Sequence, residues 1–201
     1  MTVAVRSEKM ANPRLPTWLT PPPEGFTSDD LDHFPDLPAH TELIDGSLVF
    51  VSPQKDFHTT MLDLLVAETR RTTPPEFRVR REMSVILGPK QRPEPDMIVL
   101  RSEALRGPDV SAYPASHVVV AVEVVSPDSE IRDRERKPQL YAKAGIPHFW
   151  RVENNEGRPT VYVYELDPAT STYTLTGIHH DKLRLTVPFE IDIDLTKIES
   201  L

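Results

Sequence analysis

The chain has 201 residues, of which 27% are charged and 38% hydrophobic, proportions that fit one folded domain and exclude a disordered chain. No apolar run approaches the roughly 20 residues that cross a bilayer, and the first residues lack the apolar segment of a secretory signal. The net charge is -8, which argues against a generally basic DNA-binding surface. We therefore expect a cytoplasmic protein with no membrane partner.

The chain contains no cysteine, so disulfides and thiolate metal sites are excluded. Any bound metal would be held by carboxylates, histidines or backbone carbonyls. This donor set favours hard cations such as Mg²⁺ or Mn²⁺.

Residues 1–25 are predicted to form a proline-rich N-terminal extension, because prolines 13, 16, 21, 22 and 23 disfavour regular structure. Residues 26–201 are predicted to form a single domain. A short helix is expected near Ser28, which suits a helix N-cap. A hairpin is expected over 41–53, where Asp45-Gly46 forms the turn between the apolar pair Leu43-Ile44 and the apolar run Leu48 to Val51.

An amphipathic helix is predicted over 56–71, with apolar residues at helical spacing. The segment VVVAVEVV, residues 118–125, is typical of a strand covered on both faces. A polar helix follows it and ends at Ala144-Gly145. Further strands are expected over 77–87, 96–101, 148–153, 160–166, 172–178 and 183–192. This order predicts an α/β (α+β) domain with a mixed central sheet, flanking helices and a C-terminal β extension.

Two carboxylates stand where apolar neighbours would make them costly. Glu123 interrupts the β-branched run, and a carboxylate buried there needs a cation, a basic partner or a proton. Asp96 follows Pro95 at the start of the apolar strand DMIVL. On adjacent strands the two carboxylates could hold one divalent ion and position a water against a phosphodiester. A structural ion pair of Glu123 with an arginine is the alternative.

The sequence resembles the Uma2 (DUF820) family of the PD-(D/E)XK superfamily over roughly residues 40–165. Pro95-Asp96 is followed in order by EVVSPDS from Glu123, by R-D-x-x-x-K-P-x-x-Y from Arg132, and by AGIPxFW from Ala144. ELIDGSLVFVSP and His58 also match. The resemblance implies a restriction-endonuclease-like core, with Mg²⁺-dependent (or Mn²⁺-dependent) hydrolysis of DNA as the expected activity and no small-molecule organic cofactor.

The resemblance also assigns residues. Asp96 and Glu123 would be catalytic and, with the backbone carbonyl of Val124, would bind the metal. The superfamily lysine is expected two residues after Glu123, but Val125 stands there, and Lys137 in the following helix is the substitute. Asp133 is expected to cap that helix, with Pro138 near its first turn. For Lys137, a solvated surface charge is the alternative.

Four residues are predicted to support the site: His58, Ser126, Asp133 and Tyr141. For His58, a satisfied core histidine is the alternative. Glu42 is a further candidate metal ligand, with an exposed charge at a strand end as its alternative. The predicted DNA-binding residues come from two basic clusters and are Arg78, Arg80, Arg81, Arg132 and Arg134.

Three functions remain open from the sequence. The first is a metal-dependent endonuclease that hydrolyses DNA phosphodiester bonds. The second is a weak or inactive nuclease-fold module that binds nucleic acid or protein, and a homodimer is among its forms. The third is a structural β-rich domain in which Glu123 is ion-paired.

Overall fold

The computed structural model describes residue 16 and residues 19–201. Most of the expected N-terminal extension, residues 1–15 and 17–18, lies outside the described residues. The division into an extension and one domain therefore stays a prediction. In the described part, a 3-10 helix over Asp29–Asp32 follows Ser28, where the sequence predicts a short helix.

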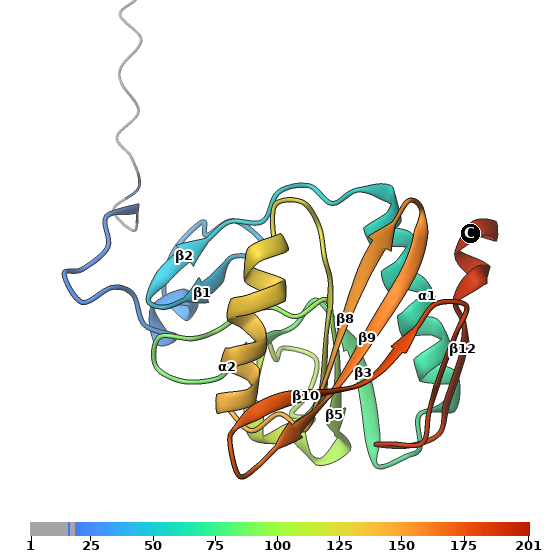
Figure 1. The fold of residues 1–201 in the computed structure, drawn as a ribbon. Coiled ribbons are helices and arrows are strands. Elements are labelled where there is room, and N and C mark those ends of the chain that lie inside the picture. Colours follow the sequence, from blue (N-terminus) through green and yellow to red (C-terminus); the bar gives the residue numbers. More distant parts are fainter. Residues whose placement is uncertain (1–15, 17–18) are drawn as a thin grey trace, which may run out of the picture.

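A six-stranded mixed sheet forms the centre of the molecule (Figure 1). Only β7 and β8 pair in parallel, and the other neighbours are antiparallel. In spatial order the strands are β10 (Thr172–His179), β9 (Arg158–Asp167), β8 (His148–Asn155), β7 (Val118–Val124), β5 (Met97–Arg101) and β3 (Phe77–Arg81). The predicted mixed sheet with a C-terminal β extension is confirmed.

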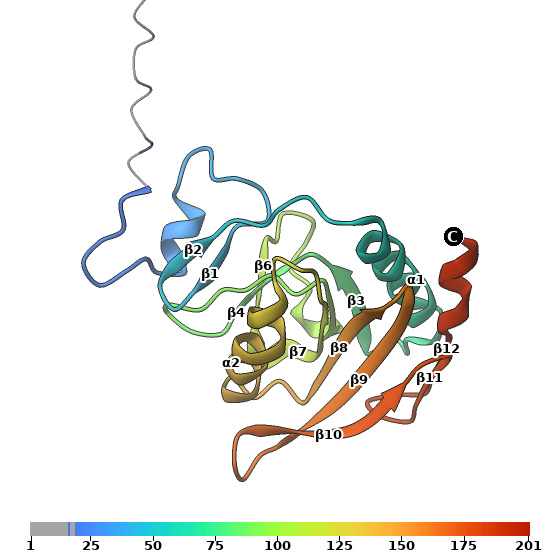
Figure 2. The same cartoon turned by 45° about the horizontal axis from the view of Figure 1, so that its top comes forward.

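The two α-helices, α1 (Asp56–Thr72) and α2 (Lys137–Lys143), cover opposite faces of this sheet (Figure 2). Alternation along β5 shows this division, because Met97 and Val99 join the core under α1, whereas Ile98 and Leu100 join the core on the α2 side. No helix in the described part of the chain is long and apolar enough to span a bilayer.

The predicted hairpin is confirmed as β1 (Glu42–Ile44) and β2 (Ser47–Val49), although it ends two residues before Val51. Both turn residues have positive φ, +53° at Asp45 and +75° at Gly46, as a two-residue turn of this type requires. Leu43 exchanges both backbone hydrogen bonds with Arg92. The hairpin is thereby fixed beside the segment that leads to Asp96.

The strand expected over 77–87 is wrong as a single element. β3 ends at Arg81, because Glu82 has φ of +49° and turns the chain there, although its N–H still donates to the carbonyl of Asp96. The chain then leaves the central sheet. Its next strand, β4 (Ser84–Ile86), pairs in parallel with β6 (Ala112–Pro114) as a small separate sheet.

The strand expected over 183–192 is also two strands. β11 (Lys182–Leu185) and β12 (Ile191–Asp194) form an antiparallel hairpin whose apolar residues join the core under α1. Pro188 lies in the intervening turn, where its missing N–H does not interrupt a ladder.

A π-helical turn over Arg132–Arg136 precedes α2, and in it the N–H of Lys137 reaches the carbonyl of Arg132. The expected capping role of Asp133 is wrong, because Ile131 is the N-cap and Asp133 lies inside the turn. Pro138 is the second residue of α2 and has no N–H to donate to the preceding turn, which accounts for the wider turn there. Single π turns of this kind are frequent at functional sites.

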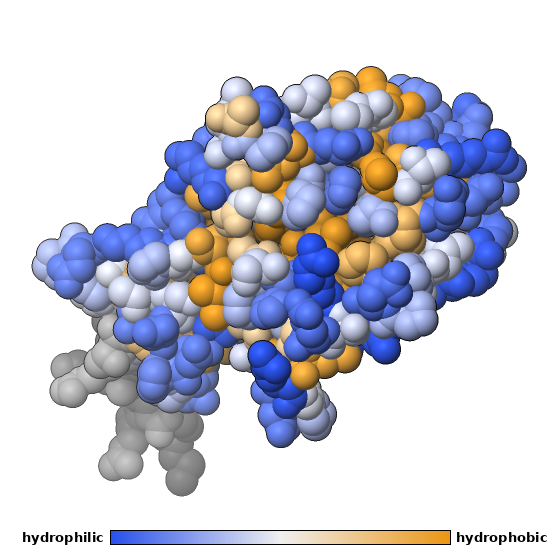
Figure 3. All heavy atoms as spheres, turned by 90° about the horizontal axis from the view of Figure 1, so that it is seen from below, coloured by the Kyte–Doolittle hydropathy of each residue, from blue (hydrophilic) through white to orange (hydrophobic). Residues whose placement is uncertain are grey.

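Hydrophobic residues are exposed in several places between polar residues on the lower face of the molecule (Figure 3). The edge strand β10 contains no charged residue and exposes Leu175 and Ile178. Uncharged edge strands are places where a second chain can pair. The homodimer stays a prediction.

Gly25 supports the hairpin that carries Glu42 and offers a test of this contact. It has φ of +80°, and a Cβ atom there would lie 2.8 Å from the carbonyl oxygen of Gly46. Gly25→Ala should lower the free energy of unfolding by at least about 1 kcal/mol more than Gly157→Ala, measured by denaturant unfolding. Gly157 is the matched control, because its φ is +88° but a Cβ would meet nothing within 4 Å. Equal losses would mean that the close approach is relieved by a small backbone shift.

Candidate active site

A cavity of about 550 Å³ lies between the α1 N-terminus, the β1–β2 hairpin and the π-helical turn, and it is rich in charged groups. The cavity-lining charged and histidine residues are Glu42, Glu82, Glu94, Asp96, Glu123, Asp128, Asp133, Lys137, Arg132, His40 and His58. Seven carboxylates therefore face one lysine and one arginine. A cavity of this composition attracts cations.

Asp96 and Glu123 reach the cavity from neighbouring strands. Met97 is paired with Val122 across the antiparallel β5–β7 ladder, so the next residues outward are Asp96 and Glu123. Asp96 has the same parity as Ile98, and Glu123 has the same parity as Ala121, and both of these apolar residues face α2. The two carboxylates therefore lie on the same face of the sheet, as a shared site requires.

Glu123 is 1% exposed and has a partner for each oxygen. Oε2 lies 3.0 Å from the Nζ of Lys137, and Oε1 accepts a 2.5 Å hydrogen bond from the hydroxyl of Tyr141. Burial raises the pKa of Glu123 well above its usual value; Lys137 opposes this shift, and the neighbouring carboxylates add to it. The one ammonium therefore does not fully compensate the negative charge.

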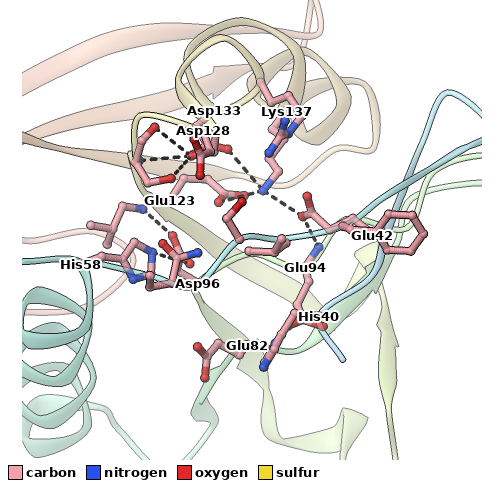
Figure 4. A pocket seen from close by; sticks show the side chains of 18 of the residues that line it. His40, Glu42, His58, Glu82, Glu94, Asp96, Glu123, Asp128, Asp133 and Lys137 are labelled. Atoms are coloured by element: carbon pink, nitrogen blue, oxygen red, sulfur yellow. Dashed lines mark hydrogen bonds and ion pairs between the residues drawn. The ribbon is translucent and has the colours of Figure 1, made fainter. Parts of the chain in front are cut away.

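Lys137 lies at the centre of this charge cluster (Figure 4). Its Nζ is 2.9 Å from Glu42, 3.0 Å from Glu123 and 3.3 Å from Asp133. Burial alone would lower the pKa of Lys137, but these carboxylates outweigh it and raise the pKa well above its usual value. The alternative of a solvated surface lysine is wrong, since the residue is 4% exposed.

Asp96 is held by two contacts. Its Oδ1 lies 3.0 Å from the Nε2 of His58, and its Oδ2 accepts a 2.6 Å hydrogen bond from the backbone N–H of Val124. Burial opposes protonation of His58, but the hydrogen bond and charge of Asp96 outweigh it and raise the pKa of His58. The contact shown for Val124 is thus through its N–H, and the metal-binding role of its carbonyl stays a prediction.

The predicted supporting residues differ in what they contact. Tyr141 donates to Glu123, and buried Asp133 pairs with Lys137. Ser126 lines the cavity, but its hydrogen bonds go to Ser129 and to neither carboxylate. Glu42 is 2% exposed, so the alternative of an exposed charge at a strand end is wrong.

Sequence reasoning missed a second group of cavity residues, Glu94 and His40. The backbone N–H of Glu94 donates to Glu42 over 2.8 Å, and the carboxylate of Glu94 lies 2.5 Å from the Nδ1 of His40. Burial raises the pKa of Glu94, and His40 opposes this shift. Glu94 stands two residues before Asp96 in RPEPD, a spacing that could have marked it as a cavity residue.

The two predicted arginine clusters do not form one basic surface. Arg78 and Arg80 on β3 donate to nearby backbone carbonyls, and neither lines the cavity. Arg81 pairs with Asp63 and Glu82, and Arg134 pairs with Glu130 and Glu153. Of the five predicted DNA-binding residues, Arg132 is the one that lines the cavity.

The donor set fits a hard divalent cation. The cavity offers carboxylate oxygens in excess over its ammonium, and each carboxylate oxygen that already accepts one hydrogen bond retains a second lone pair. Within residues 16 and 19–201, no three acidic or histidine side chains are arranged to chelate an ion. Asp96 and Glu123 would therefore act as a pair, and Mg²⁺ is commonly held by one or two carboxylates with water and substrate oxygens.

Residues 29–196 match the Uma2 family, described as "Putative restriction endonuclease". The chain belongs to the Uma2 family. The crystal structure of a putative nuclease belonging to DUF820, from Anabaena variabilis ATCC 29413, superposes on this chain with a TM-score of 0.66 at 17% sequence identity. The match covers 87% of this chain and 98% of that one. No curated protein matches the sequence.

The comparisons confirm the resemblance seen in the sequence, and the Anabaena structure confirms the fold. In this Uma2 protein, the family segment contains Asp96, Glu123 and Lys137 and also the hairpin that supplies Glu42. The roles of these residues rest on the geometry above.

The excess of negative charge around Lys137 yields a prediction for stability. Glu123→Gln should leave the metal-free free energy of unfolding unchanged or higher, because it removes a buried charge, while Lys137 keeps Glu42 and Asp133. Lys137→Met, by contrast, should lower it by about 3–5 kcal/mol, because three buried carboxylates lose their ammonium. Both are measured by denaturant unfolding with a chelator present. A loss in Glu123→Gln as large as in Lys137→Met would favour the purely structural ion pair.

Proposed function

We propose that this chain is a metal-dependent endonuclease that hydrolyses DNA phosphodiester bonds. One observation carries the proposal: Asp96 and Glu123 meet on one face of adjacent strands, with the ammonium of Lys137 bound to Glu123 at the floor of a cavity. Membership of a family described as "Putative restriction endonuclease" supports the choice of reaction and of substrate.

Asp96 and Glu123 are the residues that would hold Mg²⁺ or Mn²⁺, with the carbonyl of Val124 as a further donor. The ion, when bound, polarises a phosphoryl oxygen and lowers the pKa of a bound water. His58 and the N–H of Val124 fix the orientation of Asp96, and Tyr141 fixes that of Glu123. Such contacts behind the ligands keep them in place before the substrate arrives.

Lys137 would act at this site through its positive charge. Its raised pKa keeps it as an ammonium, so it does not serve as a general base in the resting site. Its charge can orient the attacking water and offset charge that develops on the phosphorane. Glu42 and Asp133 hold the ammonium in place for this role.

A second function is favoured by the charge balance of the molecule. The net charge is -8, and Arg81, Arg134 and Arg136 are committed to carboxylates. A nuclease-fold module with weak or no catalysis, which binds nucleic acid or protein, would carry the same features. The two functions differ in whether the purified chain cuts DNA when a divalent ion is supplied.

The most direct test is nicking of supercoiled plasmid. The purified chain should relax the plasmid with Mg²⁺ or Mn²⁺ but not with a chelator, and Glu123→Ala should abolish the reaction. Arg158→Ala is a control, because Arg158 is exposed at the start of β9 and does not line the cavity. Equal nicking by wild type and Glu123→Ala would point to a contaminating nuclease, and no nicking by wild type would favour the binding module.

Metal binding itself provides an independent measurement. Calorimetry should show Mn²⁺ binding to the wild-type chain, and Asp96→Ala should weaken it by about tenfold or more, since one of two charged ligands is lost. If Glu123 were only part of a structural ion pair, the chain would bind no divalent ion and its thermal stability would not change when such ions are added. Binding that survives unchanged in Asp96→Ala would place the ion elsewhere.

A further inference from the structure

We propose that Arg132 is the residue of this chain that binds a phosphate group of the DNA strand in the catalytic cavity. The inference rests on the proposed function. It makes that function more specific, because the sequence offers five arginines as candidates for DNA binding. It assigns phosphate binding to Arg132 and not to Arg134, the other candidate in the same turn.

Neighbouring arginines of the same turn are already neutralised. The Nε of Arg134 donates to Glu153 over 3.0 Å, and a second ion pair links Arg134 to Glu130. The Nε of Arg136 donates to Asp45 over 2.7 Å. A carboxylate partner compensates the charge of a guanidinium and occupies some of its five N–H donors, so both residues attract a phosphate less strongly than an unpaired arginine does.

Arg132 differs from them in its partners. It lines the cavity, it forms no ion pair with a described residue, and its Nε is buried without an acceptor in the described part of the chain. Arg92 and Arg151 also have such an Nε, but each is ion-paired, with Asp32 and Glu153 respectively. A buried donor without an acceptor costs free energy, which an incoming anion would recover.

The π-helical turn accounts for this separation of roles. Arg132 is its first residue and Asp133 the second, and the turn closes on the N–H of Lys137. Asp133 and Lys137 are both buried and face each other, while Arg132 remains half-buried at the cavity wall. Lys137 at the end of this turn is thus a cation paired with carboxylates, whereas Arg132 at its start is a cation without a carboxylate partner among the described residues.

The chemistry of the cavity fits this division. A phosphodiester enters a space lined by seven carboxylates, which repel it unless cations intervene. The ammonium of Lys137 is shared among three carboxylates, whereas the guanidinium of Arg132 has hydrogen-bond donors to offer. A guanidinium also binds two phosphate oxygens at once, which an ammonium does with less directional fit.

The first experiment measures binding of an end-labelled DNA duplex by anisotropy, with Ca²⁺ in place of Mg²⁺, together with kcat and KM for cleavage in Mg²⁺. Arg132→Ala should raise Kd and KM by about 10- to 100-fold, with a smaller change in kcat. It should also flatten the dependence of log Kd on log salt by about one phosphate contact. Arg132→Lys should fall between Arg132→Ala and wild type, because the charge remains but the planar fork is lost.

Arg136→Ala is the matched control, since it removes an arginine from the same turn that is paired with exposed Asp45 outside the cavity. It should change Kd and KM by less than about twofold, as expected for a surface ion pair. Equal effects of Arg132→Ala and Arg136→Ala, with all variants folded by thermal denaturation, would overturn the inference.

A second measurement separates this inference from the proposed function. In a ¹⁵N spectrum, the Nε–H signal of Arg132, assigned by its loss in Arg132→Lys, should shift on titration with inorganic phosphate. A shift in a wild-type chain that does not cut DNA would leave the anion site standing and reject the nuclease. Cleavage by wild type with no such shift, and with Arg132→Ala fully active, would reject Arg132 and keep the nuclease.

Discussion

The burial of one ammonium among carboxylates is the constraint on which the site depends. Lys137 is taken out of water only because Glu42, Glu123 and Asp133 surround it, and those carboxylates are buried in turn only because Lys137 is present. The three acids come from β1, β7 and the π-helical turn. The lysine therefore ties the hairpin, the centre of the sheet and the following helix to one point.

The alternation of side chains along the strands decides on which face of the sheet this cluster lies. Glu123 and Ala121 face α2, while Val122 and Val124 join the core under α1, so a shift of one residue in β7 would move Glu123 to the other face. The β5–β7 register then sets Asp96 beside Glu123. Backbone geometry thus brings the two carboxylates together before any metal is considered.

Much of this arrangement could be predicted from the sequence because the signals are local. A glutamate in a β-branched strand, an aspartate after a proline, and a helix after a short turn each carry their own signal. Asp45-Gly46 also fixed the hairpin that delivers Glu42. The convergence of these residues on one cavity follows from strand alternation and from the order of elements along the chain.

Other features depend on contacts between distant segments and could not be read from the sequence. β3 ends where Glu82 adopts a φ of +49°, and no glycine, asparagine or proline in the sequence marks that bend. The sequence predicts that Asp133 caps the helix, but the residue lies inside the π-helical turn and pairs with Lys137. The arginine clusters suggest a basic surface, but in the fold several of these arginines pair with carboxylates from distant or neighbouring segments, namely Asp45, Asp63, Glu130 and Glu153.

The paired arginines and the acidic cavity raise the question of how a negatively charged protein could bind DNA, which is also negatively charged. Long-range attraction of DNA is weak for a molecule of net charge -8, so under the proposed function most of the driving force for binding would come from within the cavity. Under the proposed function, a divalent ion at Asp96 and Glu123 converts a repulsive cavity into one that accepts a phosphodiester. Each ligand then raises the affinity for the other by the same factor, because coupling between two binding sites is reciprocal. The excess carboxylates that disfavour DNA in the metal-free cavity would then be the same groups that make metal and DNA binding cooperative.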